Sequence, residues 1–148
     1  MSELRDAMQA AFDSVPVHGL IGLQVVAAGD DGPAIMQIPL APEALGATGQ
    51  LHGGVVALLC DVACAVAASS ASTYDHQIHA LVTADLHVRY LATARGDRVR
   101  AEATVVKAGR ALVVVEGRVT DGEGRLIAIA DFSATLVPRR DPLASPEG

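Results

Sequence analysis

Residues 50–70 read QLHGGVVALLCDVACAVAASS, and the fold of the chain is decided here. The stretch has no Pro, and Ala, Leu and Val extend over a length that indicates a helix rather than a strand. Such a helix is apolar on every side, so we expect it to be buried at the centre of the protein. A single carboxylate, Asp61, interrupts it, and a charge inside a buried helix is costly unless another group pairs with it or uses it. Asp61 is therefore the first candidate for function.

The same helix carries both cysteines of the chain, Cys60 and Cys64, one turn apart on one face. A disulfide between consecutive turns of one helix would constrain nothing new. We interpret the pair as small buried hydrophobic residues in a reduced, cytoplasmic protein.

Composition narrows the classes of partner. The net charge is −6 and aromatic residues make up only 3% of the chain, which argues against a nucleic-acid partner. The central stretch is too short, too rich in Ala and too interrupted to predict a membrane span. The N-terminus lacks the basic and apolar regions of a secretory signal. The histidines form no metal-ligand pattern with acidic or Cys residues, so we expect no bound metal. Without a predicted membrane span or secretory signal, we expect a cytoplasmic location and no membrane partner.

The segments around the central helix read as one short helix and six strands. The predicted helix covers residues 2–14, and the predicted strands cover 20–28, 34–40, 80–91, 98–107, 111–120 and 125–137. Tight turns such as 29–33 and 121–124 join consecutive strands and favour antiparallel pairing. One curved antiparallel sheet wrapped around one long central helix is an α+β fold. We expect a single domain over residues 1–148, with a flexible tail at about 138–148.

Two glycines, Gly53 and Gly54, open the central helix. The first N–H groups of a helix have no partner within it and carry partial positive charge, and a residue without a side chain lets a ligand approach them. They can therefore stabilise the oxygen of a polarised carbonyl, as an oxyanion hole does. The alternative is that the glycines only let the chain turn tightly into the helix.

The spacing between Gly53 and Asp61 points to a second subunit. Asp61 lies about 12 Å beyond Gly53 along a helix, so one helix cannot bring both to the same substrate carbonyl. A second subunit with its helix packed antiparallel would bring each Asp61 to the helix start of its neighbour. This reasoning predicts a homodimer with two composite sites. The alternative for Asp61 is a buried hydrogen-bonding or interface residue.

The chain resembles the hotdog-fold acyl-CoA thioesterases, and in particular their phenylacetate-pathway branch. The residues that carry the resemblance are Gly49, His52-Gly53-Gly54, Asp61, 82–91 (VTADLHVRYL), Gly96-Asp97 and 107–110 (KAGR). The resemblance implies the hotdog fold and hydrolysis of an acyl- or aryl-acetyl-CoA thioester to free acid and coenzyme A. It also implies a homodimer, or a homotetramer built as a dimer of dimers. No cofactor is implied, since coenzyme A is part of the substrate.

The resemblance implies roles for single residues as well. Gly53 gives its N–H to the thioester oxygen, and Asp61 of the other subunit activates a water as general base or attacks as nucleophile. Thr83 orients the water, or is an ordinary β-branched strand residue. Lys107 and Arg110 meet the coenzyme A phosphates, or are solvated charges at a hairpin.

Four further residues complete the predicted substrate site: His52, which braces the turn, Gly54, Gln50 and Arg89. One position departs from the family, because Gly46 stands where its members usually have Asn or Gln, whose amide helps to position the thioester or the water. Gln50 lies nearby as a substitute for that amide. The alternative function is a non-catalytic acyl-CoA-binding hotdog protein.

Overall fold

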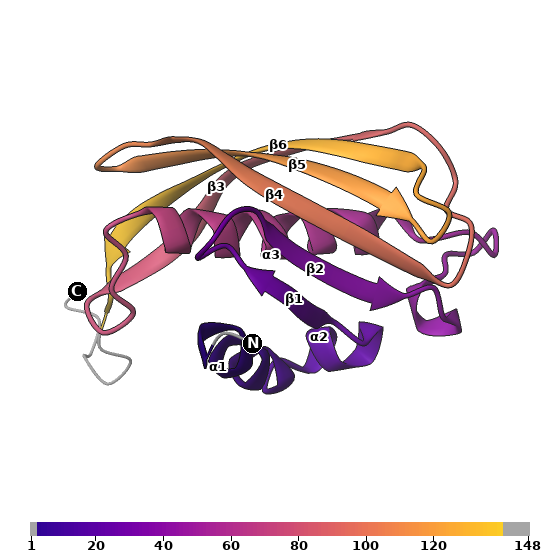
Figure 1. Cartoon of the computed structure of the whole chain (residues 1–148), viewed down its shortest axis with the longest axis horizontal. Helices are drawn as coiled ribbons and strands as arrows, with labels where there is room; N and C mark the ends of the chain where they lie inside the picture. The colour runs from indigo at the N-terminus through magenta and orange to yellow at the C-terminus, as the bar shows by residue number, and fades with distance from the viewer. Residues whose placement is uncertain (1–2, 141–148) are drawn as a thin grey trace, which may run out of the picture.

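The structure is a computed structural model, and it describes residues 3–140. Its elements, in chain order, are α1 (Glu3–Asp13), α2 (Pro16–Ile21), β1 (Gln24–Ala28), β2 (Ala34–Pro39), η1 (Pro42–Ala44), α3 (Gly53–Ala71), β3 (His79–Tyr90), β4 (Arg98–Ala108), β5 (Leu112–Asp121) and β6 (Leu126–Pro138). Figure 1 shows a curved sheet that lies over α3, with α1 and α2 next to β1.

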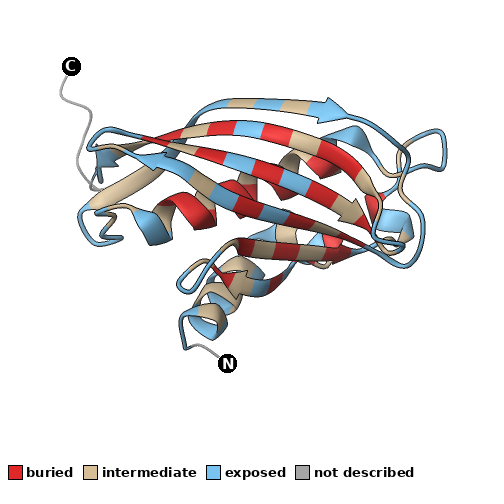
Figure 2. Ribbon diagram, turned by 45° about the horizontal axis from the view of Figure 1, so that its top comes forward, coloured by how far each residue is buried: buried red, intermediate tan, exposed pale blue. Residues whose placement is uncertain are grey.

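The six strands form one antiparallel sheet in the order β1-β2-β4-β5-β6-β3. Buried and less buried residues alternate along the central strands, as the banding in Figure 2 shows. In β4, for example, Val99, Ala101 and Ala103 are buried, whereas the residues between them are not. The alternation follows from the two-residue period of a strand, which puts every second side chain against α3. The predicted α+β fold is confirmed.

The sheet covers only part of the circumference of α3. The buried residues of the helix are Val56, Leu59, Cys60, Val62, Ala63, Cys64, Val66, Ala67 and Ala68. Val55, Leu58, Asp61 and Ala65 follow one another at helical spacing and are only half-buried, and we call them the open stripe. The expectation of a helix buried on every side is therefore wrong for the single chain, because a curved sheet closes around one side of a helix.

By length and composition alone, α3 would also qualify as a membrane span, and 50% of that span is buried inside the fold. Its apolar character is accounted for by its place under the sheet. Cys60 and Cys64 are buried and free, as the sequence predicts. Burial is the main reason that the pKa of each thiol is raised to about 12, and the neighbouring Asp61 carboxylate contributes to the shift.

The N-terminal region departs from the strand predicted over residues 20–28. A short helix, α2, occupies its first part, with Pro16 in the first turn and Gly22 after the last turn in the left-handed conformation, at a φ of 68°. β1 begins only at Gln24. Pro16 starts a helix and Gly22 ends it, although the residues between them are apolar enough to suggest a strand. The short 3-10 helix η1 was likewise not predicted, and it lies between the predicted strand 34–40 and the central helix.

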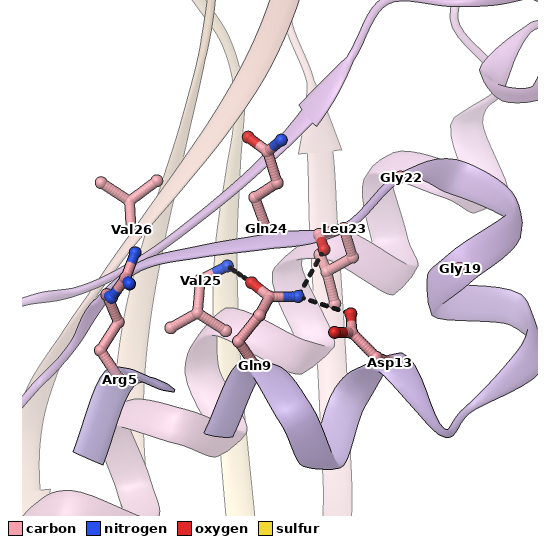
Figure 3. Close-up of a pocket in the computed structure, with 9 residues that line it drawn as sticks. All are labelled: Arg5, Gln9, Asp13, Gly19, Gly22, Leu23, Gln24, Val25 and Val26. Carbon is pink, nitrogen blue, oxygen red and sulfur yellow. Dashed lines mark hydrogen bonds between the residues drawn. The ribbon is translucent and has the colours of Figure 1, made fainter. Parts of the chain in front are cut away.

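One side chain of α1 covers the free edge of β1. The amide of Gln9 donates a hydrogen bond to the carbonyl of Leu23 over 3.1 Å and accepts one from the N–H of Val25 over 2.6 Å (Figure 3). It thus pairs with backbone groups that a further strand would otherwise use, which protects an edge strand from wrong association. Asp13 accepts from the same amide over 2.8 Å. The pocket drawn in Figure 3 therefore surrounds a contact that docks α1 on the sheet.

The described part of the C-terminal tail is attached to the fold. β6 extends to Pro138, and Arg139 donates its N–H to the carbonyl of Ile78 over 2.9 Å. The tail predicted at about 138–148 therefore begins with two residues that contact β3 or the turn before it, since Pro138 pairs with His79. Residues 141–148 of the predicted tail lie outside the described residues.

Candidate active site

Asp61 and Thr83 meet beside the open stripe of α3. The hydroxyl of Thr83 donates a hydrogen bond to Oδ1 of Asp61 over 2.8 Å. The structure therefore brings together two of the residues predicted to be catalytic, one from α3 and one from β3. The bond uses the hydroxyl proton, so the lone pairs of the Thr83 oxygen and the second carboxylate oxygen remain as acceptors.

A β-bulge aims Thr83 at the carboxylate. The pairing of β3 with β6 shifts between Thr83 and Asp85, so that Ala84 is an extra residue in β3. Leu81 and Thr83 face α3 before the bulge, whereas the even-numbered residues of β3 do so after it. Bulges of this kind are frequent next to active sites, where they redirect a side chain.

Beyond the bulge, Leu86 and Val88 pack against the core, and Tyr90 reaches the start of α3. Arg89 lies between Val88 and Tyr90, so it points to the other face of the sheet, where it is exposed. The single chain does not bring Arg89 to the other predicted site residues.

His52 caps the start of α3. Its Nδ1 accepts a hydrogen bond from the N–H of Gly54 over 2.9 Å, so His52 braces the turn. Since Nδ1 is an acceptor, we assign the ring proton of neutral His52 to Nε2. The cap occupies the N–H of Gly54, whereas the N–H of Gly53 has no acceptor among residues 3–140. Of the two glycines, Gly53 is thus the one with an unused N–H at the positive end of the helix.

Tyr90 closes over Gly53 from β3. Its hydroxyl donates to the carbonyl oxygen of Gly53 over 2.6 Å, and its ring lies 3.5 Å from where a Cβ on Gly53 would be. Burial is the main reason that the pKa of Tyr90 is raised, so the hydroxyl keeps its proton at neutral pH. Sequence reasoning did not single out Tyr90. The alternation in 86–91 (LHVRYL) puts Tyr90 on the core face, but it does not say which part of the helix that face meets.

The loop before α3 places Gly46 beside His52 and Gln50 beside Tyr90. Gly46 donates its N–H to the carbonyl of Gln50 over 2.8 Å, and a Cβ on Gly46 would lie 3.4 Å from the imidazole of His52. An amide side chain at position 46 would thus stand at the helix start, and this chain has none there. Gln50 instead lines a cavity of about 330 Å³ together with Tyr90 and residues 91–94.

Lys107 and Arg110 are exposed at the end of β4 and in the turn that follows it. Strand register puts this turn at the Thr83 end of the sheet, since Val113 of β5 pairs with the β6 residue that also pairs with Thr83. The start of α3 lies at the opposite end, where Tyr90 meets Gly53 (Figure 1). These two basic residues are therefore remote from the helix start of their own chain.

A single chain thus carries the predicted site as two separate halves. Asp61 and Thr83 form one half, and the start of α3 with Gln50 and Tyr90 forms the other. The two halves are about 12 Å apart along α3. Within residues 3–140, no cluster of three or more His, Cys, Asp or Glu side chains could hold a metal ion.

A buried carboxylate holds the loop that follows β3. Asp121 is 5% exposed, and it accepts hydrogen bonds from the backbone N–H groups of Arg95, Glu123 and Arg125 and from the Arg125 side chain. Burial alone would raise the pKa of Asp121, but these bonds outweigh it and hold the pKa below its usual value. Arg125 also donates to the carbonyl of Thr93, in the wall of the cavity beside Gln50. Sequence reasoning identified only a turn here, although Asp at the start of a turn is a known signal for such bonds.

Comparisons with known proteins identify the family of the chain. A model of the family described as the thioesterase superfamily matches residues 48–128, which contain both halves of the site. A Halobacterium salinarum protein that is classed provisionally as an esterase is 34% identical over 116 residues, which cover 75% of this chain and 76% of that protein. The 1,4-dihydroxy-2-naphthoyl-CoA hydrolase of Listeria monocytogenes is 25% identical over 120 residues, which cover 81% of this chain and 94% of the hydrolase.

The fold has a close counterpart among solved structures. A thioesterase from Haemophilus influenzae superposes with a TM-score of 0.83 and 19% identity, and the match covers 97% of each chain. It supports the predicted hotdog fold, in which an antiparallel sheet wraps one long helix. Because the family match extends over more than half of its residues, the chain belongs to the thioesterase superfamily.

Proposed function

We propose that this protein is an acyl-CoA thioesterase that hydrolyses an acyl- or aryl-acetyl-CoA thioester to free acid and coenzyme A. The observation that carries the proposal is the hydrogen-bonded Asp61–Thr83 pair on the open side of α3, in a chain whose helix start also offers an unused Gly53 N–H. The thioesterase family and the CoA thioester in the name of the Listeria relative support the reaction class.

The finer assignment rests on the sequence. The motifs around His52 and Asp61 resemble those of the phenylacetate-pathway branch, and they support the assignment of the protein to that branch as one hotdog domain. A cytoplasmic location agrees with two buried, free thiols, Cys60 and Cys64.

The active form in this proposal is a homodimer, and two such dimers assemble into a homotetramer. Apart from Asp61, the open stripe is apolar, and it is left uncovered by the sheet of its own chain. β3 is an edge strand that exposes Val82 at 45%, and Ile78 in the turn just before β3 is exposed at 59%. A second copy that packs its α3 antiparallel would cover the stripe and would bring each Asp61 to the partner subunit's Gly53.

In the proposed reaction, Asp61 takes a proton from a water as the water oxygen attacks the thioester carbonyl carbon. Thr83 orients this water by accepting a hydrogen bond from it, because its own proton is engaged by Asp61. The Gly53 N–H of the other subunit stabilises the charge that develops on the carbonyl oxygen. The C–S bond then breaks, and the leaving thiolate takes the proton from Asp61. Direct attack by the carboxylate, followed by hydrolysis of the resulting anhydride, is the other route open to the same pair.

The polar parts of the substrate have candidate partners as well. Lys107 and Arg110 would meet the phosphates of coenzyme A, since both are exposed at the Thr83 end of the sheet. Gln50 would supply the amide that position 46 lacks. His52 and Gly54 would hold the shape of the helix start.

A non-catalytic acyl-CoA-binding protein is the second candidate, and the observation that favours it is Gly46, which leaves no amide beside His52. Release of free thiol from a panel of straight-chain, phenylacetyl- and hydroxyaryl-CoA thioesters distinguishes the two. Saturable hydrolysis of at least one thioester is the expected result. Binding by calorimetry without thiol release across the whole panel would assign the protein to the binding class instead.

A further inference from the structure

We propose that Tyr90 is a positioning residue for the oxyanion donor: its hydroxyl clamps the carbonyl of Gly53 and so fixes the direction of the Gly53 N–H. The inference rests on the proposed function, because it assumes that this N–H meets a thioester oxygen. Tyr90 belongs to the stretch 82–91 that carries the resemblance, but no role for its side chain was predicted from the sequence.

The proposed site depends on the direction of the Gly53 N–H, and glycine by itself does not fix that direction. Glycine has more backbone freedom than any other residue, and it stands at the first position of α3, where helix ends are least constrained. An oxyanion donor is effective only when it is held toward the position of the developing charge. Something outside the helix must therefore restrict the backbone at Gly53.

The peptide units on both sides of Gly53 are held. The unit before it ends in the carbonyl of His52, which accepts from the N–H groups of Val55 and Val56 over 3.0 and 3.2 Å. In the unit after it, the Gly53 carbonyl accepts from Tyr90 and the Gly54 N–H donates to His52. Tyr90 is the member of this set that comes from the sheet, so it ties the helix start to β3.

The hydrogen bonds are also arranged to strengthen one another. A carbonyl that accepts a bond makes the N–H of the same peptide unit a better donor. The Tyr90 bond thus strengthens the Gly54–His52 cap, and the two bonds on the His52 carbonyl strengthen the N–H of Gly53 itself. The Tyr90 hydroxyl is protonated, and hence a donor, throughout the neutral range, since burial raises its pKa further above the ordinary value of 10.0.

A purely structural role would be small at this position. Tyr90 is 53% exposed, so its side chain buries little area, and its hydroxyl removal leaves the ring in place over Gly53. Tyr90→Phe should therefore fold with a melting temperature close to that of the wild type. Tyr74→Phe is the matched control, because Tyr74 is the other tyrosine of the chain and makes no contact with the helix start.

The test compares both variants with the wild type on the thioester that the panel identifies. Tyr90→Phe should lower kcat about tenfold with KM unchanged, as a loss of alignment in the transition state requires. Tyr74→Phe should leave both constants unchanged. If Tyr90→Phe keeps the kcat of the wild type, or raises KM alone, Tyr90 does not position the donor. The proposed function would still hold in that case, because the unmutated protein hydrolyses the thioester.

A second readout needs no activity. In an amide NMR spectrum, Tyr90→Phe should move the Gly54 N–H proton resonance upfield, because its hydrogen bond to His52 loses polarisation, and Tyr74→Phe should not. An unmoved resonance would overturn the clamp even if kcat falls. If the wild type hydrolyses no thioester, the proposed function fails separately, and the NMR comparison still decides whether the clamp exists.

Discussion

At position 61, one carboxylate stands at the edge of the core with one hydroxyl bonded to it. The side chain of Asp61 is half-buried, and the described residues supply no cation to it. A structural carboxylate in this setting would normally gain an ion pair or several N–H donors, as Asp121 does in the same chain. The contrast between the two aspartates favours a chemical role for Asp61.

Asp61→Asn should lower turnover by about a hundredfold or more, because the amide cannot act as a base or nucleophile. The fold and acyl-CoA binding should persist, since Asn can still accept the bond from Thr83 at this half-buried position. Steady-state hydrolysis, a thermal melt and calorimetric binding measure the three effects. Hydrolysis near the wild-type rate by a folded Asp61→Asn protein would remove this carboxylate from the mechanism.

Asp61 and Gly53 could be predicted because their signals are local: a charge in an apolar helix, and a side-chain-free helix start. The orientation of Thr83 could not, because the bulge at Ala84 changes which residues face α3, and simple alternation contains no such shift. The alternation of apolar residues predicts the face of β3 on which Tyr90 lies. Its contact with Gly53 could not be predicted, because it depends on how far β3 extends past the helix.

The elements show the same division between local and tertiary signals. The central helix and the antiparallel strands follow from periodicity and turns, whereas the predicted strand 20–28 wrongly included Leu20 and Ile21, the last two residues of the short helix α2. Its boundaries were marked by Pro16 and Gly22, so the information was present in the sequence. The uncovered side of α3 was not predictable, since it depends on how far the sheet curves.

At the end of the sheet near the start of α3, the β3–β4 loop and the β5–β6 turn interlock. Gly122 donates its N–H to the carbonyl of Arg95 over 3.0 Å, and a Cβ on Gly96 would lie 2.8 Å from the backbone of Gly122. Asp121 is bonded to both segments. This carboxylate therefore stabilises the loop that forms one wall of the cavity beside Gln50.

Asp121→Asn should lower the melting temperature at pH 7, and the difference from the wild type should shrink in acid. The pKa of Asp121 is lowered in the folded state, so its stabilisation is present above the ordinary value of 3.8 and is lost as the pH falls through the lowered value. Melting curves from pH 7 to pH 3 measure the effect, with the exposed Asp31→Asn as control. A difference that stays constant over this range would mean that the ionised carboxylate is not the stabilising form.

For the whole molecule, the central fact is that one chain separates the Asp61–Thr83 pair from the Gly53 N–H by about 12 Å along α3. Helix geometry predicted this separation from the sequence, and it follows from the rise per residue alone. The way in which two copies would pack was not predictable, because it depends on surfaces that form only after folding. The open stripe and the edge strand β3 now supply those surfaces.

The proposed contacts of Lys107 and Arg110 with the coenzyme A phosphates are tested by reversing both charges, which lie far from the reacting thioester. Lys107→Glu with Arg110→Glu should raise KM for acyl-CoA with a smaller change in kcat, because uniform binding is lost. A short acyl thioester that lacks the nucleotide should be unaffected. Arg118→Glu, exposed on β5, is the matched control. If the double variant impairs both substrates equally, the assignment of these residues to the phosphates is wrong.

The composite site is tested most directly by complementation between two inactive variants. Gly53→Pro removes the donor N–H, and it suits this position because proline is tolerated in the first turn of a helix and His52 before it is already extended, with a ψ of 127°. Asp61→Asn removes the base. Each variant should be folded and inactive alone, as a thermal melt and a hydrolysis assay would show.

In a mixed dimer, purified through a different tag on each chain, one site combines the intact Gly53 of one chain with the intact Asp61 of the other. The second site carries both lesions. We predict that this mixed dimer regains about half of the wild-type activity, since one of the two composite sites is whole. A mixed dimer that is folded, stable and inactive would show that the two groups do not act across subunits, and it would contradict the composite site.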